Sequence, residues 1–208
     1  MPVIAVDGPA ASGKGTIAQA LASHFGLPHM DTGLLYRAVA LTLWRWGGDP
    51  GNVFEAVRAC QDMNLDPSDP ELRSEAVSQI ASAVSAYPAV RTALLDRQRN
   101  FVELPGGAVL DGRDIGTVIA PNADLKLFVT ATPEVRARRR LAELEERGMH
   151  THFEDVLAEI LTRDARDRDR IMAPLKQAAD AILIDTSTLD RESAIAEAIR
   201  IAEKRLNG

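Results

Sequence analysis

The chain lacks several features that whole classes of protein require. Cys60 is the only cysteine, so neither an internal disulfide framework nor a zinc site built from cysteines can form. No apolar run is long enough to span a membrane. The N-terminal stretch has no basic residues of the kind that begin a secretory signal. We therefore expect a cytoplasmic protein that does not contact a membrane.

Positive charge is not in excess either. There are 24 Lys and Arg residues against 30 Asp and Glu residues, which gives a formal net charge of −6. This balance argues against a nucleic-acid coat and against a polybasic membrane anchor. The remaining composition, 46% apolar and 26% charged, is that of an ordinary globular protein, and the length suits one domain. The sequence does not determine the oligomeric state, and a monomer is our expectation.

Short apolar runs alternate with longer helical patterns. The runs with the length of buried strands are Val3–Val6, Ala108–Leu110, Leu125–Val129 and Ala181–Ile184, and a fifth, very short strand is expected at Pro28–Met30. The helical patterns are Thr16–Phe25, Leu34–Trp46, Glu71–Ala86, Pro133–Arg147, Phe153–Arg170 and Arg191–Arg205. This alternation predicts an α/β fold with a doubly wound parallel sheet.

Two segments do not fit a simple alternation of strands and helices. About 100 residues separate the first strong strand from the next, too many for one crossover. The intervening region from about Asn52 to Asn100 contains no convincing strand, so we interpret it as an inserted helical lobe. Near the other end, a break at Gly148–His150 precedes a helical stretch rich in Arg and Asp. We interpret that stretch as a second mobile element.

A glycine-rich segment follows the first expected strand and opens the first expected helix, the context of a phosphate-binding P-loop. Its residues are Gly8, Pro9, Ala10, Ala11, Ser12, Gly13, Lys14, Gly15 and Thr16. Glycines let backbone N–H groups point at phosphate oxygens, and Lys14 adds a charge for the β- and γ-phosphates. Gly15 stands where the common pattern has a Ser or Thr that binds magnesium. We therefore predict that Mg2+, bound with ATP, is held mainly by phosphates and water, with Thr16 at the α-phosphate.

Two further motifs lie where expected strands end. In Asp31–Arg37, Thr32 is a candidate helix cap, and Arg37 lies one turn into the helix, within reach of an anion. In Asp111–Gly116, Asp111 has the place of a Walker-B acid, and Arg113 and Asp114 follow it. Ligands of open α/β sheets gather at such strand ends. For the first motif, the alternative is an ordinary helix cap followed by a surface arginine. For the second motif, the alternative is a purely structural salt bridge.

The run Arg163–Arg170 alternates arginine and aspartate. On a helix, Arg163, Asp167 and Arg170 share one face, so they can present two cations and one anion to a nucleotide. The alternative is a solvated helix with ion pairs between successive turns. Ser82 and Arg91 lie in the inserted lobe, and the residue pattern alone assigns them to the surface.

These motifs together resemble the bacterial cytidylate kinase family along nearly the whole chain. The residues that carry the resemblance are Gly8–Thr16, Asp31–Arg37, Asp111–Val118, Arg163–Arg170 and the Ala-Pro-Leu around Pro174. The resemblance implies a P-loop NTPase fold with a five-stranded parallel sheet. It also implies a monophosphate-binding lobe at about residues 39–100 and a lid at about 148–170. The core would comprise about residues 1–38, 101–147 and 171–208.

The resemblance also implies roles for individual residues. Members of the family transfer phosphate from ATP to CMP and also to dCMP, in pyrimidine nucleotide metabolism. Lys14, Arg113 and Arg170 would be catalytic. Ser82, Arg91 and Asp114 would read the cytosine edge, and Arg163 and Asp167 would hold the ribose hydroxyls. Arg37, Arg113 and Arg170 would surround the phosphates, with the hydroxyl of Thr32 nearby.

Two alternatives remain at the level of the sequence. The first is another small-molecule P-loop kinase, acting on UMP, dTMP or a similar acceptor. The second is a nucleotide-dependent switch that signals by binding. A guanine-reading switch needs an Asn-Lys-x-Asp motif, which the sequence does not contain.

Overall fold

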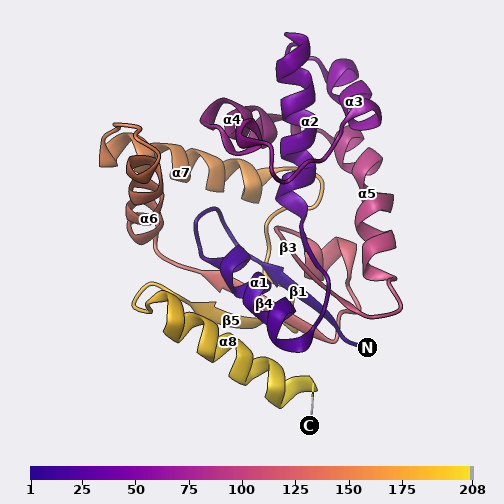
Figure 1. The fold of residues 1–208 in the computed structure, drawn as a ribbon, viewed down its shortest axis with the longest axis vertical. Coiled ribbons are helices and arrows are strands. Elements are labelled where there is room, and N and C mark those ends of the chain that lie inside the picture. The colour runs from indigo at the N-terminus through magenta and orange to yellow at the C-terminus, as the bar shows by residue number, and fades with distance from the viewer. Residues whose placement is uncertain (207–208) are drawn as a thin grey trace. The chain divides into compact units, whose positions relative to one another are not determined.

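The computed structural model describes residues 1–206, in which the strands form one five-stranded sheet. Its order is β2-β3-β1-β4-β5, and β1 pairs in parallel with both β3 and β4 (Figure 1). The strands are β1 (Val3–Asp7), β2 (His29–Asp31), β3 (Ala108–Gly112), β4 (Leu125–Thr130) and β5 (Ile182–Asp185). The α/β fold and the parallel sheet are confirmed, and each strand lies within one residue or two of the expected run.

The chain divides into two compact units. The first unit contains Met1–Met30 and the described residues from Val102 onward, and the second contains Asp31–Phe101. Helices α1 (Lys14–Phe25), α6 (Pro133–Glu146), α7 (Phe153–Asp169) and α8 (Arg191–Leu206) belong to the first unit, with a one-turn π-helix, η2 (Ile115–Ile119). The second unit is helical: α2 (Thr32–Trp46), α3 (Val53–Asp62), a short 3-10 turn η1 (Pro70–Arg73), α4 (Glu75–Val84) and α5 (Pro88–Val102).

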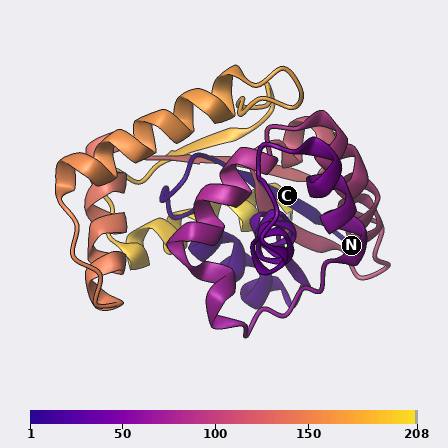
Figure 2. The same cartoon turned by 90° about the horizontal axis from the view of Figure 1, so that it is seen from above.

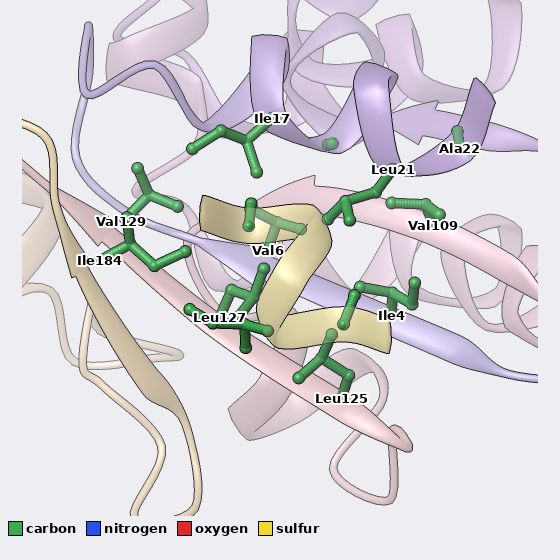
Figure 3. Close-up of a cluster of buried hydrophobic side chains, with 14 of the residues drawn as sticks. Ile4, Val6, Ile17, Leu21, Ala22, Val109, Leu125, Leu127, Val129 and Ile184 are labelled. Carbon is green, nitrogen blue, oxygen red and sulfur yellow. The ribbon is translucent and has the colours of Figure 1, made fainter. Parts of the chain in front are cut away.

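The core of the first unit lies between one face of the sheet and helices α1 and α8. Alternate residues of β1, Ile4 and Val6, point into it, because side chains along a strand alternate between the two faces (Figure 3). Ile17 and Leu21 of α1 pack against them, and all four side chains are almost fully buried. Asp7, at the end of the same strand, therefore belongs with Ala5 to the opposite face.

Helices α6 and α7 form a separate hairpin within the first unit (Figure 2). Their own small apolar cluster contains Ala137, Leu144, Val156 and Ile160. The connection covers the expected Gly148–His150 break, so the end of α6 and the start of α7 agree with the sequence pattern.

The second unit is organised around α2, which packs against α3 and α4. The expected helix over Glu71–Ala86 is in fact two elements, because Ser74 ends η1 and its side chain caps α4 by accepting from Val77 N. The expected capping role of Thr32 is also wrong. Asp31 is the cap, and its carboxylate accepts from Gly33 N at 2.9 Å. Within residues 1–206, no helix has the length and apolar character needed to cross a lipid bilayer.

Candidate active site

The glycine-rich segment forms a loop between β1 and α1, at the carboxyl end of a central strand. Gly8 is required there because a Cβ on it would lie 2.0 Å from the carbonyl oxygen of Val129. Gly13 has a left-handed backbone with φ 87° and precedes the first turn of α1. Lys14 then folds back over the loop, and its Nζ donates to the Pro9 carbonyl at 3.2 Å. The loop therefore combines a helix N-terminus with a lysine, which is an anion-binding arrangement.

Two residues that the sequence analysis did not single out support this loop from the β5 side. Thr186 Oγ1 donates to the Ser12 carbonyl at 3.0 Å. Arg139 of α6 in turn donates to the Thr186 hydroxyl and carbonyl, at 2.9 and 2.7 Å. Thr186 directly follows a strand, and ligand sites of open α/β sheets gather at strand ends, so its position in the sequence could have identified it. The pattern of α6 gave no comparable signal for Arg139.

Arg136 is a third residue that sequence reasoning missed. It is 3% exposed and forms a two-point ion pair with Asp164 of α7, at 3.0 and 2.6 Å. Its guanidinium also donates to the carbonyls of Ala131 and, at 3.4 Å, Ala10 of the phosphate loop. Arg136 thus joins α6, α7 and the loop at one point.

The Asp111–Gly116 motif lies beside the phosphate loop at the end of β3. A Cβ added to Gly15 would lie 3.7 Å from Asp111 Oδ2, so this acid faces the position where the common loop pattern has a Ser or Thr. His29 of β2, another residue that sequence analysis passed over, holds the other oxygen of Asp111 at 2.8 Å. After Gly112, Arg113 contacts Asp167 in the last turn of α7, and Asp114 contacts Arg170, the residue that follows this helix.

These contacts form a buried cluster of alternating charge. Arg113 Nε donates to Asp167 Oδ2 at 2.7 Å, and Arg170 reaches Asp114 at 3.5 Å and Asp167 at 3.8 Å. Burial would raise the pKa of Asp167, but Arg113, Arg163 and Arg170 outweigh it and hold that pKa below its usual range. Asp167 is therefore ionised at neutral pH even though it is only 4% exposed.

The solvated-helix alternative is wrong for this cluster. Asp167 and the side chain of Arg170 are almost fully buried, whereas the adjacent residues Arg168 and Asp169 form an ion pair in which both side chains are exposed. One detail of the expectation is corrected as well. Helix α7 ends at Asp169, and Arg170 is the residue after it, with an extended backbone. Its Nε donates to the Ala173 carbonyl at 2.6 Å, which directs the guanidinium back toward Asp167.

The remaining predicted residues lie in the second unit. Arg37 donates to the Leu72 carbonyl at 3.2 Å and to Ser78 Oγ at 3.1 Å, so it is not an isolated surface arginine. Thr32 is buried, in the first turn of α2.

The surface assignment of Ser82 and Arg91 is wrong, because each is only 6% exposed. Arg91 donates to the Ser85 carbonyl at 3.3 Å and lies over the ring of Tyr36, 5.5 Å from its centroid. A buried arginine fixed by an aromatic ring and a carbonyl is a rigid hydrogen-bond donor.

Metal ligands do not gather at the site. Among residues 1–206, no group of three or more His, Cys, Asp or Glu side chains is placed to hold an ion. The acids beside the phosphate loop are Asp7, which is occupied by backbone N–H groups, and Asp111, which is held by His29.

A phosphate loop on a parallel sheet, with arginine–aspartate clusters at the neighbouring strand ends, defines the chain as a P-loop phosphotransferase. Solved structures similar to it share the fold at low identity. An uncharacterized Eubacterium ventriosum protein has a TM-score of 0.58 at 14% identity, covering 99% of this chain and 100% of its own. A Thermus thermophilus protein has a TM-score of 0.50 at 22% identity, with complete coverage of both chains.

The family follows from the sequence match. The model of the cytidylate kinase family matches residues 4–204, and the chain belongs to that family. A cytidylate kinase of Rhodopseudomonas palustris strain BisA53 is 55% identical over 204 residues, 97% of this chain and 96% of the relative. One of Xanthobacter autotrophicus strain Py2 is 55% identical over 208 residues, 99% of each chain. The chain is therefore an ATP-dependent phosphotransferase, as its motifs predict.

Proposed function

We propose that the protein transfers the γ-phosphoryl group of ATP to CMP, giving CDP and ADP, and that dCMP is a second acceptor. The observation that carries the proposal is the buried cluster around Asp167. An ionised carboxylate held by arginines is an acceptor-only group, which suits it to receive hydrogen bonds from sugar hydroxyls. The family match over residues 4–204 supports the choice of CMP.

On the donor side, the phosphate loop binds the ATP phosphates through its backbone N–H groups. Lys14 lies across the loop, and we assign it to the β- and γ-phosphates. Phosphoryl transfer passes through a loose, charge-rich transition state, so alignment and electrostatic stabilisation supply the catalysis. An acceptor phosphate that is already ionised needs no general base.

On the acceptor side, we assign three arginines to the phosphates, and an arginine with an acid to the sugar. Arg37, Arg113 and Arg170 would bind the acceptor and transferring phosphates, and Arg163 with Asp167 would hold the ribose. In the structure, Arg113 and Arg170 are directed by carboxylates and carbonyl groups rather than extended into solvent. Such pre-organised cations cost little reorganisation when the phosphates bind.

The cytosine edge would be read by Ser82, Arg91 and Asp114. Cytosine presents an amine donor and a ring-nitrogen acceptor, and uracil presents the reverse. A site built for one base therefore leaves buried polar groups unpaired with the other. The burial of Ser82 and Arg91 supports this assignment, because an unpaired group costs most where water is excluded.

Mg2+ would enter with ATP. The residues of the loop fit an ion held through phosphates and water, because Gly15 offers no hydroxyl where the common pattern has a Ser or Thr. Asp111 is the acid placed to accept hydrogen bonds from the water around such an ion. The ion would neutralise charge on the transferring phosphates. We further propose a cytoplasmic monomer that acts on nucleotides and not on nucleic acid, in keeping with the net charge of −6.

The experiment that tests the proposal is a panel of acceptors assayed by ADP release under matched conditions. We expect kcat/KM for CMP to exceed that for UMP by at least about tenfold, or about 1.4 kcal/mol. If UMP, dTMP or AMP is the better acceptor, the choice of CMP is wrong and only the kinase class remains. Comparing CMP with dCMP in the same panel tests the second acceptor.

A further inference from the structure

Asp7 is a buried acid for which the phosphotransfer chemistry described above has no use. It is the last residue of β1, directly before Gly8, and it is 4% exposed. Its carboxylate accepts two backbone hydrogen bonds, from Ile115 N and Gly116 N, both at 2.8 Å. These two N–H groups immediately follow Asp114.

The two hydrogen bonds join two loops that carry different parts of the site. One loop is the phosphate loop, which begins at Gly8. The other is the segment Gly112–Gly116, which carries Arg113 and Asp114. The loops leave adjacent parallel strands, and Asp7 pairs in register with Gly112. Beyond that register, the carboxylate is a side-chain link between the strand that opens the phosphate loop and the segment that follows Asp114.

The backbone at Gly116 packs closely against the side chains of Asp7 and Lys126. A Cβ added to Gly116 would lie 3.3 Å from Asp7 Oδ2 and 3.1 Å from Lys126 Cδ. Lys126, on β4, does not neutralise the acid, since its Nζ donates to the Pro121 carbonyl and to Asp180. Asp111 on β3 is paired with His29, and Lys14 on α1 donates to Pro9. The charges of the linked segment itself, Asp114 and Arg113, act on Asp7 in opposite senses.

Burial raises the pKa of Asp7 to about 6, against the opposing effect of the hydrogen bonds from Gly116 and Ile115. Only the ionised carboxylate can accept from both N–H groups with both oxygens. Protonation turns one oxygen into a donor, which faces a backbone donor in turn. The link is therefore complete above about pH 6 and weakened below it.

We propose that Asp7 is a positioning residue that fixes the Gly112–Gly116 segment to the phosphate loop, so that Arg113 and Asp114 meet the acceptor nucleotide in the correct place. The inference rests on the proposed function for the identity of that acceptor. The link itself is a property of the protein without substrate, so it can be tested separately.

The direct test is an amide-resolved NMR titration of the unliganded protein from about pH 5 to 8. We expect the amide proton shifts of Ile115 and Gly116 to change together with a midpoint near pH 6. This measurement needs no variant and no substrate. If both shifts stay constant while the protein is folded, the carboxylate does not change its hydrogen bonds in this range, the pH dependence given to the link is wrong, and the kinetic test below decides the positioning role.

The kinetic test compares Asp7→Asn with Asp124→Asn. Asp124 is a matched control, because its exposed carboxylate also accepts one backbone N–H, from Val3 at the other end of β1. We expect Asp7→Asn to lower kcat/KM for CMP at least about tenfold at about pH 7.5 or above, with the KM for ATP within about threefold. The loss relative to the wild type should shrink below about pH 6, where the wild-type carboxylate is itself protonated. The control should match the wild type. Wild-type kinetics in Asp7→Asn would overturn the proposal.

If Asp7→Asn does not fold, Gly116→Ala replaces it, since the added methyl group would lie 3.3 Å from Asp7 Oδ2 and so crowds the link while the acid keeps its charge. We expect the same selective loss toward CMP, and equal effects on both substrates would count against the link. Failure of the proposed function has a different signature. In that case another nucleotide is a better acceptor than CMP, while the amide proton shifts of Ile115 and Gly116 still change with pH.

Discussion

At the scale of single residues, the site depends on charged groups whose positions are fixed by neighbours before any ligand binds. Lys14 is held by a loop carbonyl, Asp111 by His29, and Asp167 by Arg113. Each of these contacts costs side-chain entropy during folding rather than during catalysis. A substitution at such a position therefore changes the chemistry and the local packing together, and its test needs a matched control.

Lys14→Ala removes the positive charge assigned to the transferring phosphoryl group. We expect kcat to fall on the order of a thousandfold, about 4 kcal/mol, while the protein stays folded, because this charge acts mainly in the transition state. Steady-state kinetics with a circular dichroism spectrum measures both quantities. Lys204→Ala, on the exposed side of α8, is the control and should leave kcat unchanged. Near-wild-type turnover in folded Lys14→Ala would refute the role given to the loop.

Asp167→Asn keeps the size of the side chain and removes its charge. We expect the KM for CMP to rise at least about tenfold and the KM for ATP to stay within about threefold, because the carboxylate serves the acceptor sugar. Asp169→Asn is the matched control, two residues away in an exposed pair with Arg168 that contributes little to stability. Equal kinetics of the two variants would remove Asp167 from the acceptor site.

At the scale of elements, local signals were sufficient for part of the site and insufficient for the rest. The phosphate loop was predictable because its chemistry lies within nine consecutive residues that follow a strand and open a helix. Ser82 and Arg91 were not, since their burial comes from packing within a helical unit and not from their own pattern. The cap of α2 was predicted one residue too late, at Thr32 instead of Asp31, because both are residue types that cap helices well.

Long-range side-chain contacts account for the other misses. Arg136 looks like one of several arginines on a polar helix until the fold places it against Asp164 and the phosphate loop. Arg139 and Thr186 meet in the same way, from segments that the sequence does not relate. Periodicity shows which face of a helix is polar, but it does not show what that face meets.

Arg136→Ala tests whether this contact holds the α6–α7 hairpin. Removing one partner leaves Asp164 without its ion pair and two carbonyls without a donor, so we expect a loss of about 3 kcal/mol in unfolding free energy. Denaturant titration measures it. Arg138→Ala, on the exposed side of the same helix, should cost less than about 1 kcal/mol. If the two variants are equally stable, the buried contact between Arg136 and Asp164 stabilises the protein no more than an exposed arginine does.

At the scale of the whole molecule, stability and activity make opposite demands on Asp7. In the folded protein its pKa is raised from 3.8 to about 6, so the folded state holds a proton that the unfolded chain has already lost. The contribution of this group to stability is therefore largest at low pH and is lost as pH rises through about 6. The positioning role, in contrast, needs the ionised form. At neutral pH the protein is therefore less stable by the free energy of keeping the buried Asp7 carboxylate ionised, which is the form that positions the segment.

This opposition predicts how the unfolding free energy of the wild type compares with that of Asp7→Asn across pH. A shift of about 2 units corresponds to about 3 kcal/mol, of which about 2 kcal/mol should disappear between about pH 4.5 and 7. The unfolding free energy of the wild type should therefore fall relative to that of the variant as pH rises, and the difference between the two should level off above about pH 6.5. Urea titrations at several pH values measure it, with Asp124→Asn showing the effect of removing one exposed charge. A difference that is constant across this range, or that grows with pH, would mean that Asp7 is ionised in the folded protein at every pH tested, and the pH dependence given to the link would then be wrong.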